Sequence, residues 1–288
     1  MNNIAVKQNE DEMLSLLKLQ RFQYNNISKI STLNLILSIV LPIILSIIGL
    51  FDLQENVVLY INLIGAVCIF ICLFLDTRIK ELKNKAAQVQ YIFDINLFGW
   101  KQNSLISNLL ITELISIAQK NKIKSLTGLE NWYSVDKNLS VNDAIFSCQQ
   151  QNIRWDKKLR KKYMNLINIG CSVFVLLIVS FAILSDISFN VLWSYIFLIM
   201  PIFTYCIVFT ITTKSNLKDQ DELINTFNQY KNKKTISNKD LISLEEKIFY
   251  YRKDLVKIPN WFFNLYRKEM QEEANNYAKV ESELSDQN

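Results

Sequence analysis

Four stretches of the chain contain no Asp, Glu, Lys or Arg, and they dominate its pattern of hydrophobic and polar positions. They cover residues 30–51, 57–75, 163–185 and 187–213. A helix of about 20 apolar residues crosses the hydrocarbon core of a bilayer. Within each stretch, apolar residues occur on all sides of the predicted helix instead of on one face, which is typical of helices in contact with lipid. Burial of all four in a soluble core would leave too little chain to cover them, so we predict four transmembrane helices.

The predicted helices form two tight hairpins. Residues 52–56 join the first pair, and only Asp186 separates the second pair. Because one residue cannot reverse a helix, we expect the second turn to lie within residues 184–190. All 32 Lys and Arg residues lie outside these two connections. Since Lys and Arg remain on the cytoplasmic side of a membrane, both termini and the long middle segment are expected in the cytoplasm.

The segments outside the membrane carry the signals of helices. Residues 76–91 continue the second span, and residues 105–120 are amphipathic. Asn9 precedes acidic residues and an apolar repeat, so we expect it to cap a helix. Ser140 and Ser237 each stand three positions before an Asp, which is the spacing of a capping box, and the first of these helices could run unbroken into the third span. Pro259 suits the first turn of a helix over residues 260–278.

The predicted fold is therefore an all-α membrane protein with five successive parts. They are a cytoplasmic amphipathic helix (1–29), a first transmembrane hairpin (30–75), a cytoplasmic helical domain for sensing and assembly (76–162), a second hairpin (163–213) and a cytoplasmic helical C-terminal region (214–288).

Composition removes many kinds of chemistry. The chain has no His, so it has no His-dependent triad and no His ligand for zinc or haem. We find no glycine-rich phosphate loop and no metalloprotease or hydrolase motif. We therefore predict no catalytic residues, no cofactor and no metal. Cys68 and Cys72 stand four positions apart on one predicted span, where a helix contact is a better explanation than a metal site.

Basic side chains cluster where the predicted helices leave the membrane. Attraction to anionic lipid explains such clusters. Binding of an anionic ligand, such as a nucleotide or oligonucleotide, also explains such clusters. Composition does not separate the two explanations. The candidate ligand-binding residues are Lys83, Lys85, Arg154, Lys157, Lys158, Arg160 and Lys161.

Uncharged polar residues form stripes along two of the predicted spans. Hydrogen bonds between helices explain such stripes, and so does a water-filled path with an apolar constriction. Four helices are too few for a wide pore, so a path requires a homo-oligomer, for which we favour a tetramer. The candidate pore-lining residues are Asn190, Ser194, Phe197, Thr204, Val208 and Thr212 in the fourth span and Asn34 and Ser38 in the first.

Six segments, in order along nearly the whole chain, resemble the S-4TM family of membrane effectors. The first four are Ile4–Asn9, Leu19–Tyr24, Phe93-Asp94 with Trp100, and Asn131-Trp-Tyr133. The fifth is the stretch Cys148–Arg160, which includes Gln149, Asn152, Trp155 and Asp156. The sixth is Arg252 with Ile258, Pro259, Trp261 and Arg267. Structural roles suit several of these residues. Tyr133, Trp132, Trp155 and Trp261 suit a core or an interface, and Asp94, Asp156, Arg160 and Arg252 suit buried ion pairs.

The resemblance implies an anti-phage effector in the bacterial inner membrane. It implies a partner nucleotidyltransferase that makes a cyclic or linear oligonucleotide signal, which controls whether the effector opens the membrane. Three hypotheses follow: an oligomeric, nucleotide-controlled pore; a membrane-anchored adaptor that recruits a cytosolic partner without conducting ions; and, least favoured, a membrane enzyme.

Overall fold

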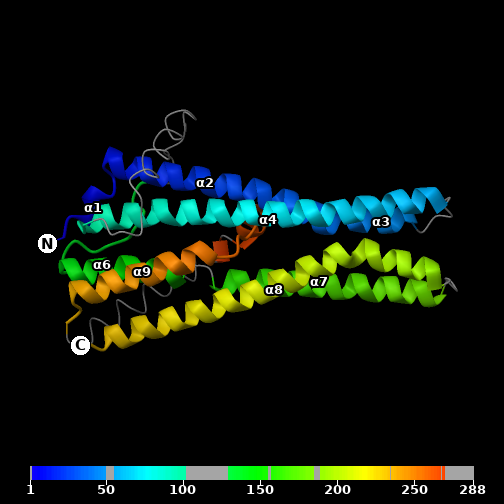
Figure 1. Ribbon diagram of the computed structural model, residues 1–288. Helices are drawn as coiled ribbons and strands as arrows, with labels where there is room; N and C mark the ends of the chain where they lie inside the picture. The colour runs from blue at the N-terminus through cyan, green and yellow to red at the C-terminus, as the bar shows by residue number, and fades with distance from the viewer. Residues whose placement is uncertain are drawn as a thin grey trace.

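The computed structural model is an elongated assembly of long helices (Figure 1). It describes residues 2–49, 55–101, 129–154, 157–184, 189–233, 235–266 and 268–269. Within these ranges the secondary structure is helical and no strand occurs, in agreement with the predicted all-α class. The helices are α1 (Ile4–Lys7), α2 (Asp11–Leu35), the π-helical turn η1 (Ile36–Val40), α3 (Leu41–Gly49), α4 (Glu55–Phe98), α6 (Val141–Arg154), α7 (Lys157–Leu184), α8 (Phe189–Lys231) and α9 (Asn238–Asp254).

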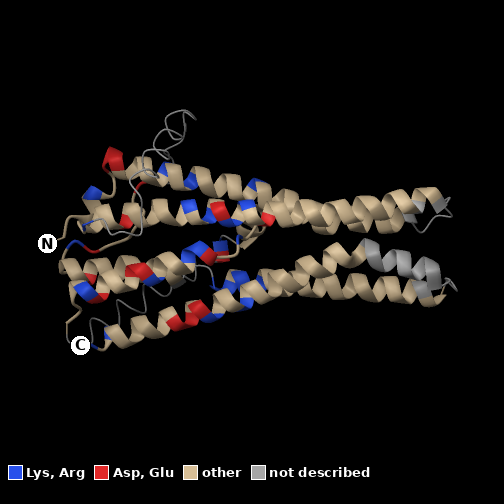
Figure 2. Cartoon of the chain, viewed as in Figure 1, with Lys and Arg blue, Asp and Glu red and all other residues tan. Residues whose placement is uncertain are grey.

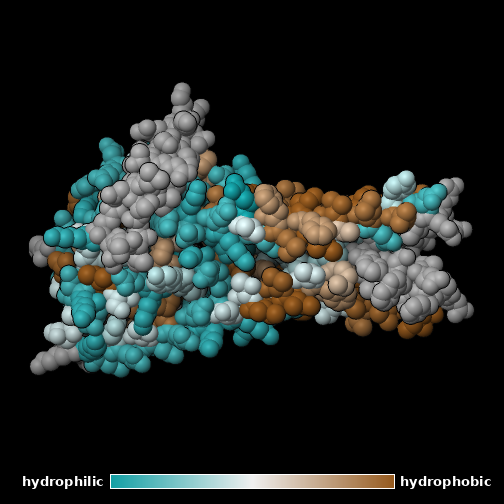
Figure 3. Space-filling view, viewed as in Figure 1, coloured by the Kyte–Doolittle hydropathy of each residue, from teal (hydrophilic) through white to brown (hydrophobic). Residues whose placement is uncertain are grey.

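The described charges gather in one half of the molecule, and the other half is apolar. Figure 2 shows Lys, Arg, Asp and Glu along the half that contains α6 and α9, and Figure 3 shows a hydrophobic surface over the half that contains α3 and α7. Three helical stretches are long and apolar enough to cross a membrane: Asp11–Ile48, Leu59–Phe98 and Val141–Phe181. The predicted fourth span begins among residues that lie outside this search, because residues 185–188 are not described.

The helices α2, η1 and α3 follow one another in a single rod that packs beside α4 (Figure 1). The π-helical turn Ile36–Val40 stands just before Pro42. Proline lacks an N–H group and clashes with the carbonyl four residues earlier. A widened turn relieves that clash, so the sequence explains the position of η1.

α4 is one unbroken helix of 44 residues. The continuation of the second span into residues 76–91 is thus confirmed. The helix ends at Gly99, whose φ of 73° suits a residue without a Cβ. The backbone N–H of Gly99 donates to Asn96 O and that of Trp100 to Ile95 O, the bond pair of a Schellman cap.

α7 and α8 lie side by side and form the second pair of long helices (Figure 1). α7 ends at Leu184 and α8 begins at Phe189, so the helix ends fall where the sequence places the second turn. The rings of Tyr163 and Phe209 meet edge to face across the pair, 5.3 Å apart.

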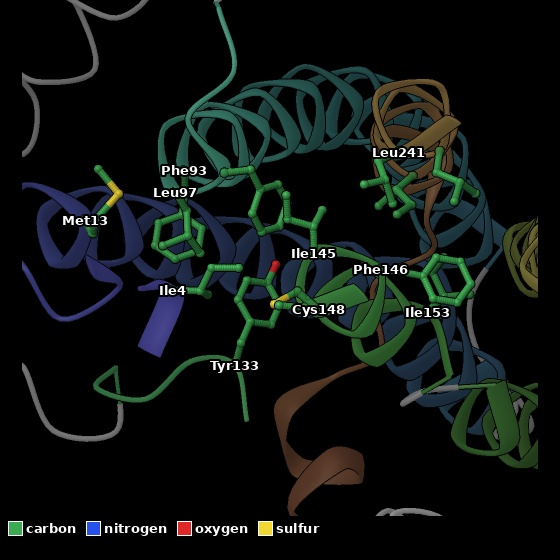
Figure 4. Close-up of a cluster of buried hydrophobic side chains, with 14 of the residues drawn as sticks. Ile4, Met13, Phe93, Leu97, Tyr133, Ile145, Phe146, Cys148, Ile153 and Leu241 are labelled. Atoms are coloured by element: carbon green, nitrogen blue, oxygen red, sulfur yellow. The ribbon is translucent and has the colours of Figure 1, made fainter. Parts of the chain in front are cut away.

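The charged half has a core of its own, to which α1, α2, α4, α6, α8 and α9 contribute. Figure 4 shows Ile4, Phe93, Tyr133 and Ile145 close together from separate segments, with Leu241 of α9 on the far side of the same cluster. This core joins the N-terminal segment, the far end of α4, the residues before α6, and α9. Segments that are far apart in the sequence therefore share one core in the charged half.

The capping predictions have different outcomes. Ser237 and Asp240 form the predicted capping box at α9, and the Ser140 hydroxyl accepts from Asp143 N at 3.3 Å at α6. The prediction for Asn9 is wrong, because α2 has Glu10 at its N-cap and no side-chain cap. The Asn9 amide instead donates to Asn131 Oδ1 at 3.0 Å.

Other predicted helices lie partly or wholly beyond the described ranges. Residues 105–120 are outside them, and so are residues 155–156 between α6 and α7. Of the predicted helix over residues 260–278, residues 260–266 are described and helical.

Candidate functional site

Three ionisable side chains, Asp94, Glu245 and Arg252, form a buried charge cluster between α4 and α9. Arg252 Nη1 donates to Asp94 Oδ2 at 2.7 Å and to Glu245 Oε1 at 3.3 Å. The Tyr133 hydroxyl donates to Asp94 Oδ1 at 2.5 Å, and Gln149 Nε2 of α6 donates to Glu245 Oε2 at 2.9 Å. Arg252 is 6% exposed and Asp94 is fully buried. The predicted burial of Asp94 and Arg252 in an ion pair is therefore confirmed.

The charge cluster is electrically neutral at neutral pH. Burial raises the pKa of Glu245 to about 8; the Asp94 carboxylate acts in the same direction and Arg252 opposes it. Glu245 is therefore mostly protonated, and Asp94 and Arg252 balance each other. The same surroundings raise the pKa of the Tyr133 hydroxyl and of the Cys148 thiol, chiefly through burial. A buried cluster of this kind is tolerated because its groups are paired and hydrogen-bonded.

An extended segment after α9, residues 255–259, ties the long helices together where the charged and apolar halves meet. We call it the strap. Arg160 of α7 donates to the carbonyl of Val256. Asn216 of α8 accepts from Val256 N at 2.8 Å and donates to Asp254 O at 3.2 Å. The strap thus contacts α7 and α8 through backbone hydrogen bonds, and the buried Ile258 side chain packs with Leu159 of α7 and Phe209 of α8.

Lys83 and Arg160 are the two candidate ligand-binding residues that the fold brings together. Burial lowers the pKa of Lys83 to about 8. The nearby Asp254 opposes that shift, whereas Lys80 and Arg160 reinforce it. Lys83 Nζ lies 3.5 Å from Asp254 O. Two partly desolvated cations beside each other favour an anion, because an anion would relieve their repulsion.

Two other candidates are held by acidic residues. Lys157 forms an ion pair with Asp221 of α8. Lys158 Nζ lies 3.1 Å from Glu269, whose other oxygen is 2.6 Å from Lys162 Nζ. These pairs are solvent-exposed, so a ligand phosphate can compete for the lysines at small cost.

The remaining candidates on this surface are less defined. Lys161 is exposed on α7, and Lys85 is half-buried on α4. Arg154 is the last residue of α6, and its side chain lies outside the described part of the chain.

The candidate pore residues of the first span face α4 in this structure. Asn34 Nδ2 donates to Asp76 Oδ1 at 2.7 Å. Ser38 Oγ lies 3.1 Å from Cys72 Sγ and 3.5 Å from Asn34 Oδ1. Both residues are buried. Their contacts join α2 and η1 to α4, which is the helix-contact explanation of the stripe.

The candidate pore residues of the fourth span lie along α8. Thr204 and Val208 are exposed. The Thr212 hydroxyl donates to Val208 O at 2.8 Å, within the helix. For the three nearest the helix start only the backbone is described, namely Asn190, Ser194 and Phe197.

A shallow groove between α7 and α8 brings further polar groups to the surface of the apolar half. Thr210 Oγ1 of α8 donates to Asn168 Oδ1 of α7 at 2.7 Å. Three of the lining side chains, Cys171, Ser172 and Cys206, are small, which favours the close approach of a neighbouring helix. The lining residues are Asn168, Cys171, Ser172, Phe203, Cys206, Ile207, Thr210 and Ile211.

Comparison with known proteins identifies the family. The model of the SMODS-associating 4TM effector domain matches residues 2–280. The chain belongs to this family. A probable CBASS effector molecule of Bacillus cereus strain VD146 is 25% identical over 221 residues, which cover 74% of this chain and 73% of that protein. No solved structure matches the chain.

The segments that resemble the SMODS-associating 4TM effectors are mostly structural contacts. Gln8 exchanges hydrogen bonds with the Tyr133 backbone, accepting from its N–H at 2.8 Å and donating to its carbonyl at 3.1 Å. Gln20 Nε2 donates to Gln90 Oε1 at 2.6 Å between α2 and α4. Tyr133 lies in the core, as expected, but Trp261 is 55% exposed, contrary to a core position.

Sequence reasoning missed several residues of these sites. Glu245 gave no sequence signal, because its partner Gln149 comes from a distant part of the chain. Asn168 and Thr210 are polar residues in apolar spans, and that signal was available. Their stripe passed unnoticed because it is shared between α7 and α8. Among the described residues, no group of three metal-ligating side chains occurs.

Proposed function

We propose that the chain is an oligomeric membrane pore of bacterial anti-phage defence, opened or closed by a nucleotide signal. Each subunit contributes four spans as two hairpins, and both termini lie in the cytoplasm of the inner membrane. The charged half, with residues 76–162 and 214–288, senses the signal and holds the subunits together. A homo-tetramer is the assembly that we favour. The family supplies the effector role, and the partition of charge along the molecule supports the membrane placement.

The observation that carries the pore is the exposure of polar side chains on the apolar half. Thr204 is exposed on α8, and the Asn168–Thr210 pair opens to the groove between α7 and α8. Polar side chains that face lipid are costly. A second copy of the chain or a water-filled path would cover them. The exposed Val208, one turn from Thr204, suits an apolar constriction that gates by dewetting.

The signal site that we propose is the basic surface at the junction of the two halves. The half-buried Lys83 lies at its centre, next to Arg160, which is buried and donates to the Val256 carbonyl. Lys85, Lys157, Lys158 and Lys161, with Arg154, surround them. The relative from Bacillus cereus is described as a CBASS effector, and we propose the same context here, with an oligonucleotide signal from a partner nucleotidyltransferase. Phosphates would bind the cations.

The strap connects this surface to the membrane helices. Arg160 bonds to Val256, and Asn216 of α8 bonds to the same strap residue. A ligand that binds one arrangement of these contacts more tightly shifts the population of closed and open states. These contacts support a short route from the proposed signal site to α7 and α8.

Reconstitution tests the signal site and the pore together. Purified protein in proteoliposomes should conduct ions in a way that oligonucleotides change. Replacement of Lys83 and Lys161 by Gln should weaken oligonucleotide binding. The control is Lys247→Gln, which replaces an exposed lysine on α9 and should leave binding unchanged. The proposal would be contradicted if the purified protein stayed monomeric, bound no oligonucleotide and conducted no ions. The alternative is a membrane-anchored adaptor, for which binding would persist without ion flow.

A further inference from the structure

The helical residues 260–266 expose an apolar face at the junction of the charged and apolar halves. Trp261 is 55% exposed and Leu265 is 69% exposed. Four residues apart, they lie one above the other on a helix. The opposite face is buried, with Phe262 in a small core that includes Leu159 and Phe209. The segment is thus fixed to the molecule by one face and presents two large apolar side chains on the other.

Contacts with α7 set the level of this face relative to the membrane. The Phe262 and Trp261 rings lie 4.8 Å and 6.3 Å from the ring of Tyr163. Tyr163 is the first residue of the third predicted span, and the basic run 157–162 ends just before it. Trp261 and Leu265 are therefore exposed where α7 passes from charged to apolar surroundings.

Among the described residues, the charges around this face are positive on balance, with Lys158, Lys162 and Lys268 against Glu269. Glu269 is engaged by Lys158 and Lys162, and Lys162 Nζ lies 4.3 Å above the Tyr266 ring. Lys268 is exposed and follows Trp261 by seven residues, so it shares the exposed face. Anionic headgroups of the cytoplasmic leaflet attract such a surface.

We propose that residues 260–266 lie in the headgroup region of the cytoplasmic leaflet, with Trp261 and Leu265 in contact with phospholipid. This inference rests on the membrane placement under the proposed function and is independent of ion conduction. Trp prefers the membrane interface because its ring is apolar and its N–H is polar. A helix with two apolar anchors and flanking lysines lies in the interface plane. The strap precedes this anchor directly, so the membrane surface would fix one end of the strap.

Photo-crosslinking in the full-length protein tests the inference. A benzoylphenylalanine residue replaces Trp261 or Leu265, and the protein is reconstituted in vesicles of phosphatidylcholine and phosphatidylglycerol. Leu176, exposed on the apolar part of α7, is the positive control. Tyr250, exposed on α9 in the charged half, is the matched negative control. After irradiation, mass spectrometry counts lipid and protein adducts at each site.

The expected result is lipid adducts at positions 261, 265 and 176, and none above background at position 250. Two results would overturn the inference. One is the absence of lipid adducts at 261 and 265 while 176 reacts. The other is adducts with a second copy of the chain at 261, which would make this face a subunit contact. Loss of conduction with lipid adducts intact would count against the pore alone.

Discussion

At the scale of single residues, the protonation of Glu245 allows three ionisable groups to be buried together. Asp94 and Glu245 both contact the Arg252 guanidinium. Two ionised carboxylates would leave a net negative charge in a dry core, which is costly. Because Glu245 keeps its proton at neutral pH, only the Asp94–Arg252 pair is charged. The cluster then joins α4 to α9 without an unpaired charge.

Glu245 makes the stability of the charged half depend on pH. Its folded pKa of about 8 lies above the ordinary value of 4.5. The stabilisation is complete below pH 4.5 and is lost as the pH rises through 8. We predict that the thermal unfolding temperature of the detergent-solubilised protein falls between about pH 5 and pH 8 and that Glu245→Gln removes most of that fall. At pH 7 the variant should lie within about 1 kcal/mol of the wild type. An unchanged pH slope in the variant would contradict the assignment.

The Asp94–Arg252 pair should behave as one unit. Arg252→Met leaves Asp94 buried without its counter-ion, so we expect a loss of about 3–5 kcal/mol. Asp94→Asn should cost a similar amount for the converse reason. The double variant should cost clearly less than the sum of the two, because no charge is stranded in it. Additive losses in a double-mutant cycle, measured by chemical denaturation, would show that the pair is not coupled.

At the scale of elements, two glycines allow the same substitution to be tested in opposite settings. Gly99 ends α4 with a positive φ, and Gly170 lies inside α7; a Cβ would meet nothing within 4 Å at either. Only backbone preferences then differ. Gly99→Ala should cost about 1 kcal/mol, and Gly170→Ala should gain about 0.5–1 kcal/mol. Thermal unfolding of the two variants checks the signs, and a stabilising Gly99→Ala would contradict the Schellman cap.

Elements that depend on local sequence could be predicted, and those that depend on distant partners could not. The position of the turn between α7 and α8, the continuation of α4 beyond the predicted span and the capping box at Ser237 follow from nearby residues. The cap at Asn9 failed because that side chain bonds with Asn131 instead. Whether Asn34 lines a pore or contacts another helix could not be predicted for the same reason, because its partner Asp76 comes from another helix.

At the scale of the whole molecule, the sequence anticipated the division into charged and apolar halves. The hydropathy of a segment is the sum over its own residues, so long apolar runs can be recognised from the sequence without a structure. The meeting of Lys83 with Arg160, and the strap between α7 and α8, arise from tertiary packing. The exposed Trp261 illustrates the limit, because a tryptophan in a sequence does not show whether it faces a core or a membrane surface.

The central claim is that the assembled molecule conducts ions in response to infection. The most direct measurement is membrane potential, followed with a voltage-sensitive dye in phage-infected cells that contain the chain and its partner nucleotidyltransferase. We compare the wild type, the Thr204→Leu/Asn190→Leu variant and a Leu176→Ile control at equal membrane levels. The wild type and the control should depolarise on infection, and the polar-to-Leu variant should not. Protection from phage by a wild type that never depolarises the cell would contradict the account and would favour an adaptor.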